Sequence, residues 1–275
     1  MTKKIIVLVD LSASSSRLLL EANTWAIRLN ADLLVVHQTF SAAPAMGDPE
    51  IRSQIGLQSR REALARLAAF VAETRVSGAN IKFHITTSNL DTALLKLKTT
   101  ITADIIVVGV KDKNWVERLF LGDTAIKLVN ELSNTIIAIP ELPDTYNLSS
   151  LHVAIKQKYP LNEIAFSILI STSDNTRLPV RLMSVLKPTE PEDSTREYLQ
   201  SLCDKYSAIA DMSYELIRSE DPYSAIKQYM DGHEGLLMIQ KGTRNLADIF
   251  RKYFVNDAIS HGQFPVAILP YNATQ

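Results

Sequence analysis

Short apolar segments alternate with helix-like segments along the whole chain, and this alternation limits the fold more than any other feature of the sequence. In the first half the apolar, strand-like segments are residues 4–9, 32–37, 81–87, 105–108 and 136–139. The intervening segments carry apolar residues at helical spacing, as at Leu18, Ala22, Trp25, Ala26 and Leu29. Strands that alternate with helices predict a parallel sheet with right-handed crossovers and helices on both faces.

The same order recurs after the polar segment ELPDTYNLSS at residues 141–150. In the second half we expect strands at 151–155, 180–186, 214–217, 236–239 and 266–269, and helices at 162–170, 194–209, 224–230 and 246–259. The halves end alike, in NTIIAIP and QFPVAILP, each with a proline directly after the last strand, where no further ladder donor is needed. We therefore predict an internal duplication, with domains at residues 1–142 and 148–275.

Composition excludes several classes of protein. The 275 residues are 46% hydrophobic, enough for two buried cores, and a net charge of −1 gives no cationic surplus for nucleic acid. The longest apolar run, residues 105–110, is far shorter than the roughly 20 residues that cross a bilayer. Asp10 ends the N-terminal apolar run too early for a signal peptide, and the lone Cys203 excludes an internal disulfide. We expect a cytoplasmic protein with neither nucleic-acid nor membrane partners.

Motifs of catalysis and metal binding are missing. The five histidines are scattered, without a paired spacing or a neighbouring cysteine, which argues against zinc. The sequence has no Gly-x-Ser-x-Gly elbow and no Gly-x4-Gly-Lys-Ser/Thr loop. His37, at the end of the second strand, is expected to be structural. We therefore assign no catalytic residue and no metal ligand.

Two glycines mark a candidate ligand loop. Gly109 ends the fourth apolar strand, and Gly122 follows thirteen residues later at the start of an amphipathic helix. Glycine at such places lets backbone N–H groups approach an anion closely. The layout resembles the Gly-x2-Gly-x9-Gly-Ser/Thr nucleotide loop of the universal stress protein (UspA) family. The resemblance covers nearly the whole chain and implies two tandem α/β domains, each a Rossmann-like, adenine nucleotide alpha hydrolase-like parallel sheet of five strands.

The resemblance also implies site residues in the first half. Asp10 matches the acid that contacts adenine, and it is followed by Leu11 and Ser12 as in the family's Asp-x-Ser. The implied cofactor-binding residues are Asp10, Ser12, Gly109, Gly122, Asp123 and Thr124. Two alternatives remain open: Asp10 caps the first helix, and Gly109 serves only a tight strand exit.

Aspartates replace two key loop positions. Asp112 stands at the second glycine and Asp123 at the Ser/Thr, with Thr124 one residue late. Two unit charges about 5 Å apart repel by roughly 3 kcal/mol at an effective dielectric near 20. That energy weakens triphosphate binding about a hundredfold unless a cation such as Mg²⁺ bridges the groups. Asp123 also suits the role of a helix cap.

The second half departs further from the pattern. Lys156 stands at the acid position, Gln240 and Thr243 at the first two loop glycines, and Tyr253 near the third. We expect no ATP-type site there.

The resulting hypothesis is a non-enzymatic tandem stress-response protein. The resemblance implies action through protein partners, and pairing of the two fifth strands within one chain as a pseudo-dimer, with a homodimer of such chains left open. AMP suits the acidic loop better than ATP. The alternative is a stress sensor that binds AMP or ATP and hydrolyses ATP slowly with Mg²⁺ in the first domain.

Overall fold

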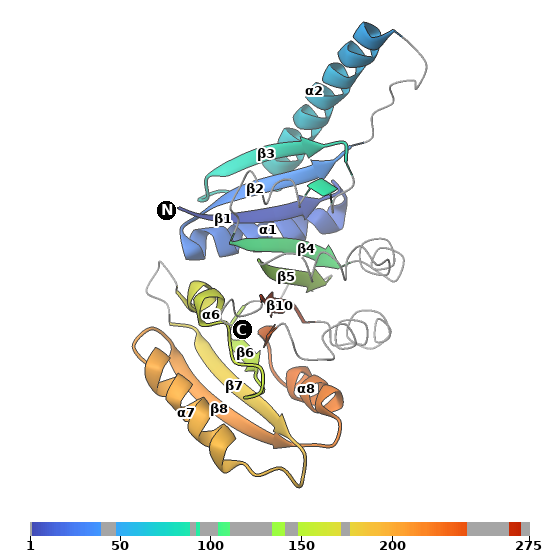
Figure 1. Ribbon diagram of the computed structural model, residues 1–275. Coiled ribbons are helices and arrows are strands. Elements are labelled where there is room, and N and C mark those ends of the chain that lie inside the picture. Colours follow the sequence, from blue (N-terminus) through green and yellow to red (C-terminus); the bar gives the residue numbers. More distant parts are fainter. Residues whose placement is uncertain are drawn as a thin grey trace. The chain divides into compact units, whose positions relative to one another are not determined.

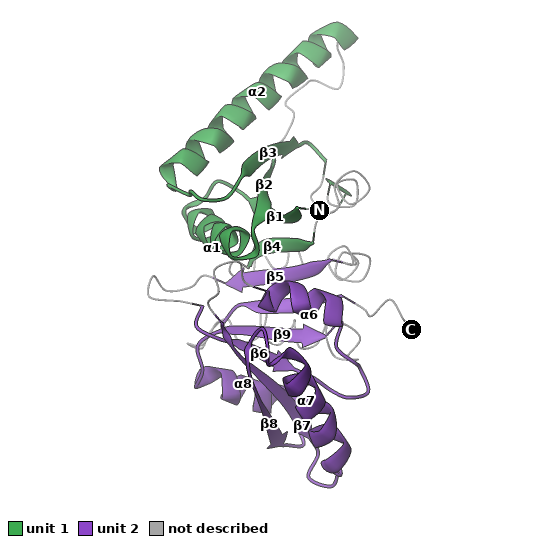
Figure 2. Ribbon diagram, turned by 90° about the vertical axis from the view of Figure 1, so that its left-hand side faces the viewer, with its two compact units in different colours: residues 1–109 green, residues 110–275 purple. Residues whose placement is uncertain are grey.

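The computed structural model describes residues 2–39, 48–88, 92–93, 104–110, 134–140, 148–171, 177–240 and 264–270. The chain divides into two compact units, residues 1–109 and residues 110–275 (Figure 2). In both units parallel strands are joined through helices, as the alternation in the sequence predicts (Figure 1).

Unit 1 contains a parallel sheet in the order β3-β2-β1-β4. Its strands are β1 (Lys3–Val9), β2 (Ala31–Gln38), β3 (Ile81–Thr86) and β4 (Ile105–Val110). β1 pairs in parallel with both β2 and β4, so that Val7 lies opposite Val35 and Val107. All three valines are fully buried, which explains why these strands are apolar at nearly every position.

Two helices are described in unit 1. α1 (Ala13–Leu29) buries the apolar face that the sequence predicts, and Asn30 ends the helix in the left-handed conformation. α2 (Pro49–Glu73) buries Ala63, Leu67 and Val71. α2 starts at Pro49, because Asp48 accepts a hydrogen bond from Glu50 N and proline occupies the first turn.

Unit 2 contains a sheet in the order β5-β10-β9-β6-β7-β8. Its strands are β5 (Thr135–Pro140), β6 (Leu151–Ala154), β7 (Pro179–Leu186), β8 (Asp211–Arg218), β9 (Leu236–Gln240) and β10 (Val266–Leu269). The five strands from β10 to β8 pair in parallel, which confirms the sheet expected for the second repeat. Its described helices are α6 (Glu163–Ile170), α7 (Asp193–Tyr206) and α8 (Pro222–Asp231).

The fifth strands of the two repeats pair with each other inside unit 2. β5 and β10 are antiparallel, with Ile137 opposite Ala267 and Ala138 opposite Val266. This antiparallel pair confirms the expected pairing of the two fifth strands. It groups β5 with unit 2, so the unit boundary at Gly109 differs from the repeat boundary at 142/148. Pro140 is the last residue of β5 instead of following it, a place where a missing N–H is tolerated.

Helices α7 and α8 lie on opposite sides of β7 and β8 (Figure 1). On the α7 side, Tyr206 donates a hydrogen bond of 2.8 Å to Glu163 of α6 and meets Phe166 edge-on, with ring centroids 5.0 Å apart. On the other side, Tyr229 of α8 reaches His152 of β6. The two faces of this sheet are therefore covered as a doubly wound fold requires.

Candidate functional site

The strand order of unit 1 fixes where a ligand site is expected. The chain moves outward from β1 through β2 to β3 and then returns to place β4 on the other side of β1. Ligands of open α/β sheets bind at the carboxyl ends of the strands where the order reverses in this way. Asp10 directly follows β1, and Gly109 lies near the end of β4, so two predicted site residues flank this point.

The Asp10 carboxylate is held by its own loop. Oδ1 accepts hydrogen bonds from Ser12 N at 3.0 Å, from Ser12 Oγ at 2.5 Å and from Ser15 Oγ at 2.5 Å. Leu11, between them, adopts a positive φ of 62°. An exposed acid fixed in this way presents a preorganised acceptor at the carboxyl edge of the sheet.

Ser12, not Asp10, occupies the N-cap position of α1. Its hydroxyl points to Asp10 and lies 3.0 Å from Ser14 Oγ, and it makes no side-chain capping bond to the helix. Asp10 is therefore no helix cap; it organises the serines that enter the helix. The positive end of the α1 dipole faces the same edge, which favours an acidic or electron-rich ligand group.

Gly109 lies inside β4, which continues to Val110, so it does not end the strand as expected. A Cβ atom at Gly109 would lie 3.1 Å from Leu18 Cδ2. The glycine therefore lets the buried Leu18 of α1 pack against β4, a reason that the sequence pattern did not reveal. Gly122, Asp123 and Thr124, together with Asp112, lie outside the described residues, and their roles remain predictions.

His37 is a neighbour of this site that the resemblance did not include. It lies opposite Val9 in the β1–β2 register, and its Nδ1 is 2.9 Å from the Val9 carbonyl oxygen. A carbonyl only accepts, so Nδ1 carries the hydrogen. The bond agrees with the structural role expected for His37 and places its half-buried ring against the backbone of Val9, the residue before Asp10. The sequence signal that could have placed His37 near the site is its position close to the end of the second strand, next to the strand that Asp10 follows.

The equivalent point of unit 2, between β6 and β9, is filled by side chains. Gln240 ends β9 and is 2% exposed. Its Oε1 accepts from Asn162 N at 2.7 Å, and its Nε2 donates to Pro270 O at 2.7 Å. Asn162 also caps α6 by accepting from Ala165 N at 3.0 Å. Gln240, which stands at a glycine position of the loop pattern, thus links β9 to the start of α6 through a hydrogen bond.

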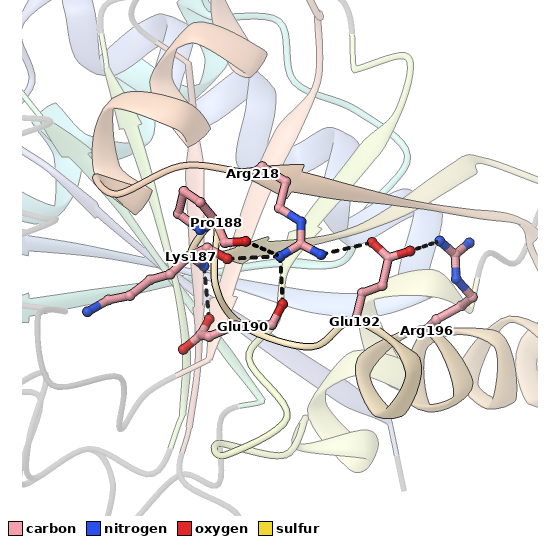
Figure 3. Close-up of polar contacts among 6 residues, drawn as sticks. All are labelled: Lys187, Pro188, Glu190, Glu192, Arg196 and Arg218. Carbon is pink, nitrogen blue, oxygen red and sulfur yellow. Dashed lines mark hydrogen bonds and ion pairs between the residues drawn. The ribbon is translucent and has the colours of Figure 1, made fainter.

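Basic residues lie at or just after the carboxyl ends of β6, β7 and β8. Arg218 Nη1 donates to the carbonyl oxygens of Lys187, Pro188 and Glu190 at 2.9, 3.2 and 2.6 Å (Figure 3). Its Nη2 lies 3.2 Å from Glu192, which also pairs with Arg196. Lys187 N donates to Glu190 and lowers the pKa of that carboxyl, and Lys156, Lys187 and Arg218 add to the effect. Arg218 therefore links β8 to the β7–α7 loop, through three backbone carbonyls of that loop and the carboxylate of Glu192.

A sequence profile of the Universal stress protein family matches residues 1–140. The chain belongs to the Universal stress protein family. Among curated proteins, no relative matches the sequence.

Solved structures extend the likeness of this universal stress protein to its whole length. A universal stress protein from Archaeoglobus fulgidus superposes with a TM-score of 0.64 at 13% identity, over 97% of this chain and 98% of that one. A putative universal stress protein from Pseudomonas aeruginosa gives 0.57 at 12% identity, over 98% and 94%. A protein of unknown function from the same species gives 0.57 at 11% identity, over 98% and 93%. At such identities the likeness shows the fold, including that of the second repeat.

Metal-binding clusters and membrane-spanning helices are both missing from the part of this universal stress protein that the structure describes. No three His, Cys, Asp or Glu side chains come together there as a metal site. No helix of these segments is both long and apolar enough to cross a bilayer.

Proposed function

We propose that this universal stress protein acts in the stress response by binding, without catalysis, in the cytoplasm. Its ligand is one adenine nucleotide with few phosphates, of the AMP class, bound in the first repeat. The observation that carries the proposal is the Asp10 carboxylate, fixed by Ser12 and Ser15 at the point where the strand order reverses. A fixed acceptor of this kind suits the exocyclic amino group of adenine.

The preference for few phosphates rests on the sequence after β4. Asp112 and Asp123 replace a glycine and a hydroxyl residue in the loop pattern, and each phosphate that approaches them adds repulsion. We propose one nucleotide site per chain, because the buried amide of Gln240 fills the corresponding place in the second repeat.

The proposed domains are the sequence repeats, residues 1–142 and 148–275. The antiparallel pairing of β5 with β10 supports a pseudo-dimer within the chain, because it covers the apolar edges of two strands that would otherwise be exposed. The protein partners through which the chain acts, and a homodimer of such chains, belong to the same proposal.

The first test is to identify what the protein carries. Native mass spectrometry of protein purified from cells shows a bound small molecule by its mass, and AMP or a related monophosphate is the expected ligand. Thermal-shift titration then compares AMP, ATP, and ATP with Mg²⁺. We expect the largest stabilisation from AMP. Saturable micromolar ATP binding that requires Mg²⁺, with release of phosphate, would support the hydrolysing sensor instead, and a flat response to all three would contradict nucleotide binding.

A further inference from the structure

A cluster of titratable side chains, two buried and two half-buried, lies between α8 and the sheet of unit 2, away from the carboxyl edge of the sheet. His152 of β6 is 2% exposed, and Tyr229 of α8 is 9% exposed. Arg181 of β7 lies opposite His152 in the strand register, and His233 follows α8. The rings of Tyr229 and His233 stack at 4.2 Å, and His152 meets both edge-on.

The hydrogen bonds of this cluster fix both imidazoles as neutral tautomers. His233 Nδ1 lies 2.7 Å from the Tyr229 carbonyl oxygen and must donate to it, so its Nε2 accepts from Arg181 Nη1 at 3.2 Å. His152 Nε2 faces Ser150 Oγ at 2.8 Å and the Glu234 carbonyl oxygen at 3.3 Å. The Ser150 hydroxyl itself donates to that carbonyl, at 2.5 Å. His152 Nε2 therefore carries the hydrogen.

The remaining nitrogen of His152 links the strands to α8. Nδ1 has the lone pair and accepts from the Tyr229 hydroxyl at 3.0 Å, while the same hydroxyl oxygen accepts from Arg181 Nη1 at 3.4 Å. The donors thus run in one direction, from Arg181 through Tyr229 and His152 to Glu234 O. A proton added at Nδ1 reverses the middle bond and leaves the Tyr229 hydroxyl facing two donors.

The turn after α8 is held tightly against this cluster. Gly235 has φ +150°, and a Cβ atom there would lie 2.4 Å from the Ser150 carbonyl oxygen. Only glycine fits this approach, and the approach keeps Glu234 O within reach of His152. The carboxyl-terminal turn of α8 and residues 232–235 are therefore fastened to the sheet through the side chains that surround His152.

We propose that this cluster is a proton-binding site, in which protonation of His152 at mildly acidic pH releases the end of α8 and the turn at residues 232–235 from the sheet. The new charge lies beside the Arg181 guanidinium in a buried position, where like charges repel strongly. Burial raises the pKa of Tyr229, and the negative charge of Glu215 on β8 adds to the effect, so an acid also acts on the cluster. Release of α8 exposes His152 to water and relieves the repulsion.

The direction of the pH dependence follows from the environment of His152. Burial lowers its pKa to about 4, the Glu234 carbonyl partly opposes this, and His233 and Arg181 reinforce it. A ring with an ordinary pKa of roughly 6.5 in the released state binds protons more readily there, so acid favours release. The closed form therefore has its full stability above roughly pH 6.5, the ordinary pKa of the released ring, and loses stability as the pH falls below that value. Opening of α8 rises about fourfold at pH 6 and about thirtyfold at pH 5, relative to pH 7.5.

Hydrogen–deuterium exchange of the full chain at pH 7.5, 6 and 5 tests this proposal. After correction for intrinsic rates, protection of the peptide spanning residues 226–235 should fall about thirtyfold between pH 7.5 and pH 5. Protection of α7 should change less than twofold. His152→Gln, which cannot take up a proton, should remove the pH response. The matched control is His84→Gln on β3 of unit 1, where burial also lowers the histidine pKa, and it should leave the α8 response intact.

A pH response in wild type below twofold, or a full response in His152→Gln, would overturn the proposal. Should His152→Gln fail to fold, NMR titration of the wild-type His152 ring decides instead. A pKa well below 6.5, with loss of the Tyr229 contact on protonation, is the expected result. A ring that titrates near 6.5 without a change in α8 would refute it.

Discussion

Gln240 accepts a hydrogen bond from the backbone N–H of Asn162 at 2.7 Å and thereby joins the end of β9 to the start of α6. Its amide nitrogen donates to Pro270 O on the segment after β10. The corresponding position of the first repeat is Gly109, which has no side chain and packs against Leu18. The same place in the two copies of the fold is thus occupied by Leu18 of α1 in the first and by the side chain of Gln240 itself in the second.

Gln240→Ala should lower the free energy of unfolding by about 2–4 kcal/mol. The change removes the Gln240 Oε1 acceptor from the buried Asn162 N–H and creates a cavity, whereas Pro270 O keeps the Asn162 amide donor at 3.3 Å. Urea unfolding measures the loss. The matched control is Gln200→Ala on α7, where the amide donates to Asp204 at an exposed position, and it should cost under about 0.5 kcal/mol. An equal loss in both variants would contradict the structural role of Gln240.

Ile137→Ala tests the pairing of the two fifth strands. Ile137 is fully buried and lies opposite Ala267 across the β5–β10 ladder. Truncation should lower the free energy of unfolding by about 2–5 kcal/mol, because the removed atoms leave a cavity in the buried core. Phe83→Ala on β3, at a side chain 38% exposed, should cost clearly less when both variants are compared by denaturant unfolding. A smaller loss for Ile137 than for Phe83 would count against the pairing.

Arg218→Ala should loosen the β7–α7 loop. Three carbonyl oxygens of that loop accept from one guanidinium nitrogen, but the side chain is 40% exposed and solvent weakens each contact. We expect a loss of roughly 1 kcal/mol in global stability and a clear rise in hydrogen exchange at residues 187–192. Arg218→Lys should restore only part of the protection, because one ammonium nitrogen cannot take the places of both Nη1 at the loop carbonyls and Nη2 at Glu192. Full rescue by lysine would contradict this account.

The double change Asp112→Gly with Asp123→Ser should create or strengthen ATP binding. It restores the glycine and the hydroxyl of the loop pattern and removes two negative charges, each worth roughly 3 kcal/mol of repulsion at about 5 Å. The expected gain in ATP affinity is about a hundredfold or more, measured by calorimetric titration without Mg²⁺. An intact fold with no gain would show that the acids do not limit triphosphate binding.

The sequence predicted the repeated elements because hydrophobic spacing and β-branched content decide strands and helices locally. The buried face of α1, the parallel pairs around β1 and β6, and the β5–β10 pair all agree with it. Element ends were less certain: the start of α2 depended on the Asp48 cap, and β4 continued through Gly109. Helix periodicity carries no information about such ends.

The geometry of the candidate site was only partly predictable, because several of its contacts link residues far apart in sequence. The sequence points to Asp10 as a candidate because it directly follows a strand. Only the structure shows that Asp10 accepts hydrogen bonds from Ser12 and Ser15 and is not the helix cap. The packing of Leu18 on Gly109 and the 78-residue link from Asn162 to Gln240 depend on the three-dimensional register of the strands. No local pattern reports such contacts.

The central claim is that the chain binds one adenine monophosphate through Asp10, while Gln240 closes the second site. Isothermal titration calorimetry with AMP on wild type, Asp10→Asn and Asp32→Asn tests it most directly. Asp32 is the matched control, since it pairs with Lys82 at the amino end of β2. We predict one AMP per chain, binding at least about tenfold weaker in Asp10→Asn, and no change in Asp32→Asn. Two AMP molecules per chain, or equal affinity in wild type and Asp10→Asn, would contradict the account.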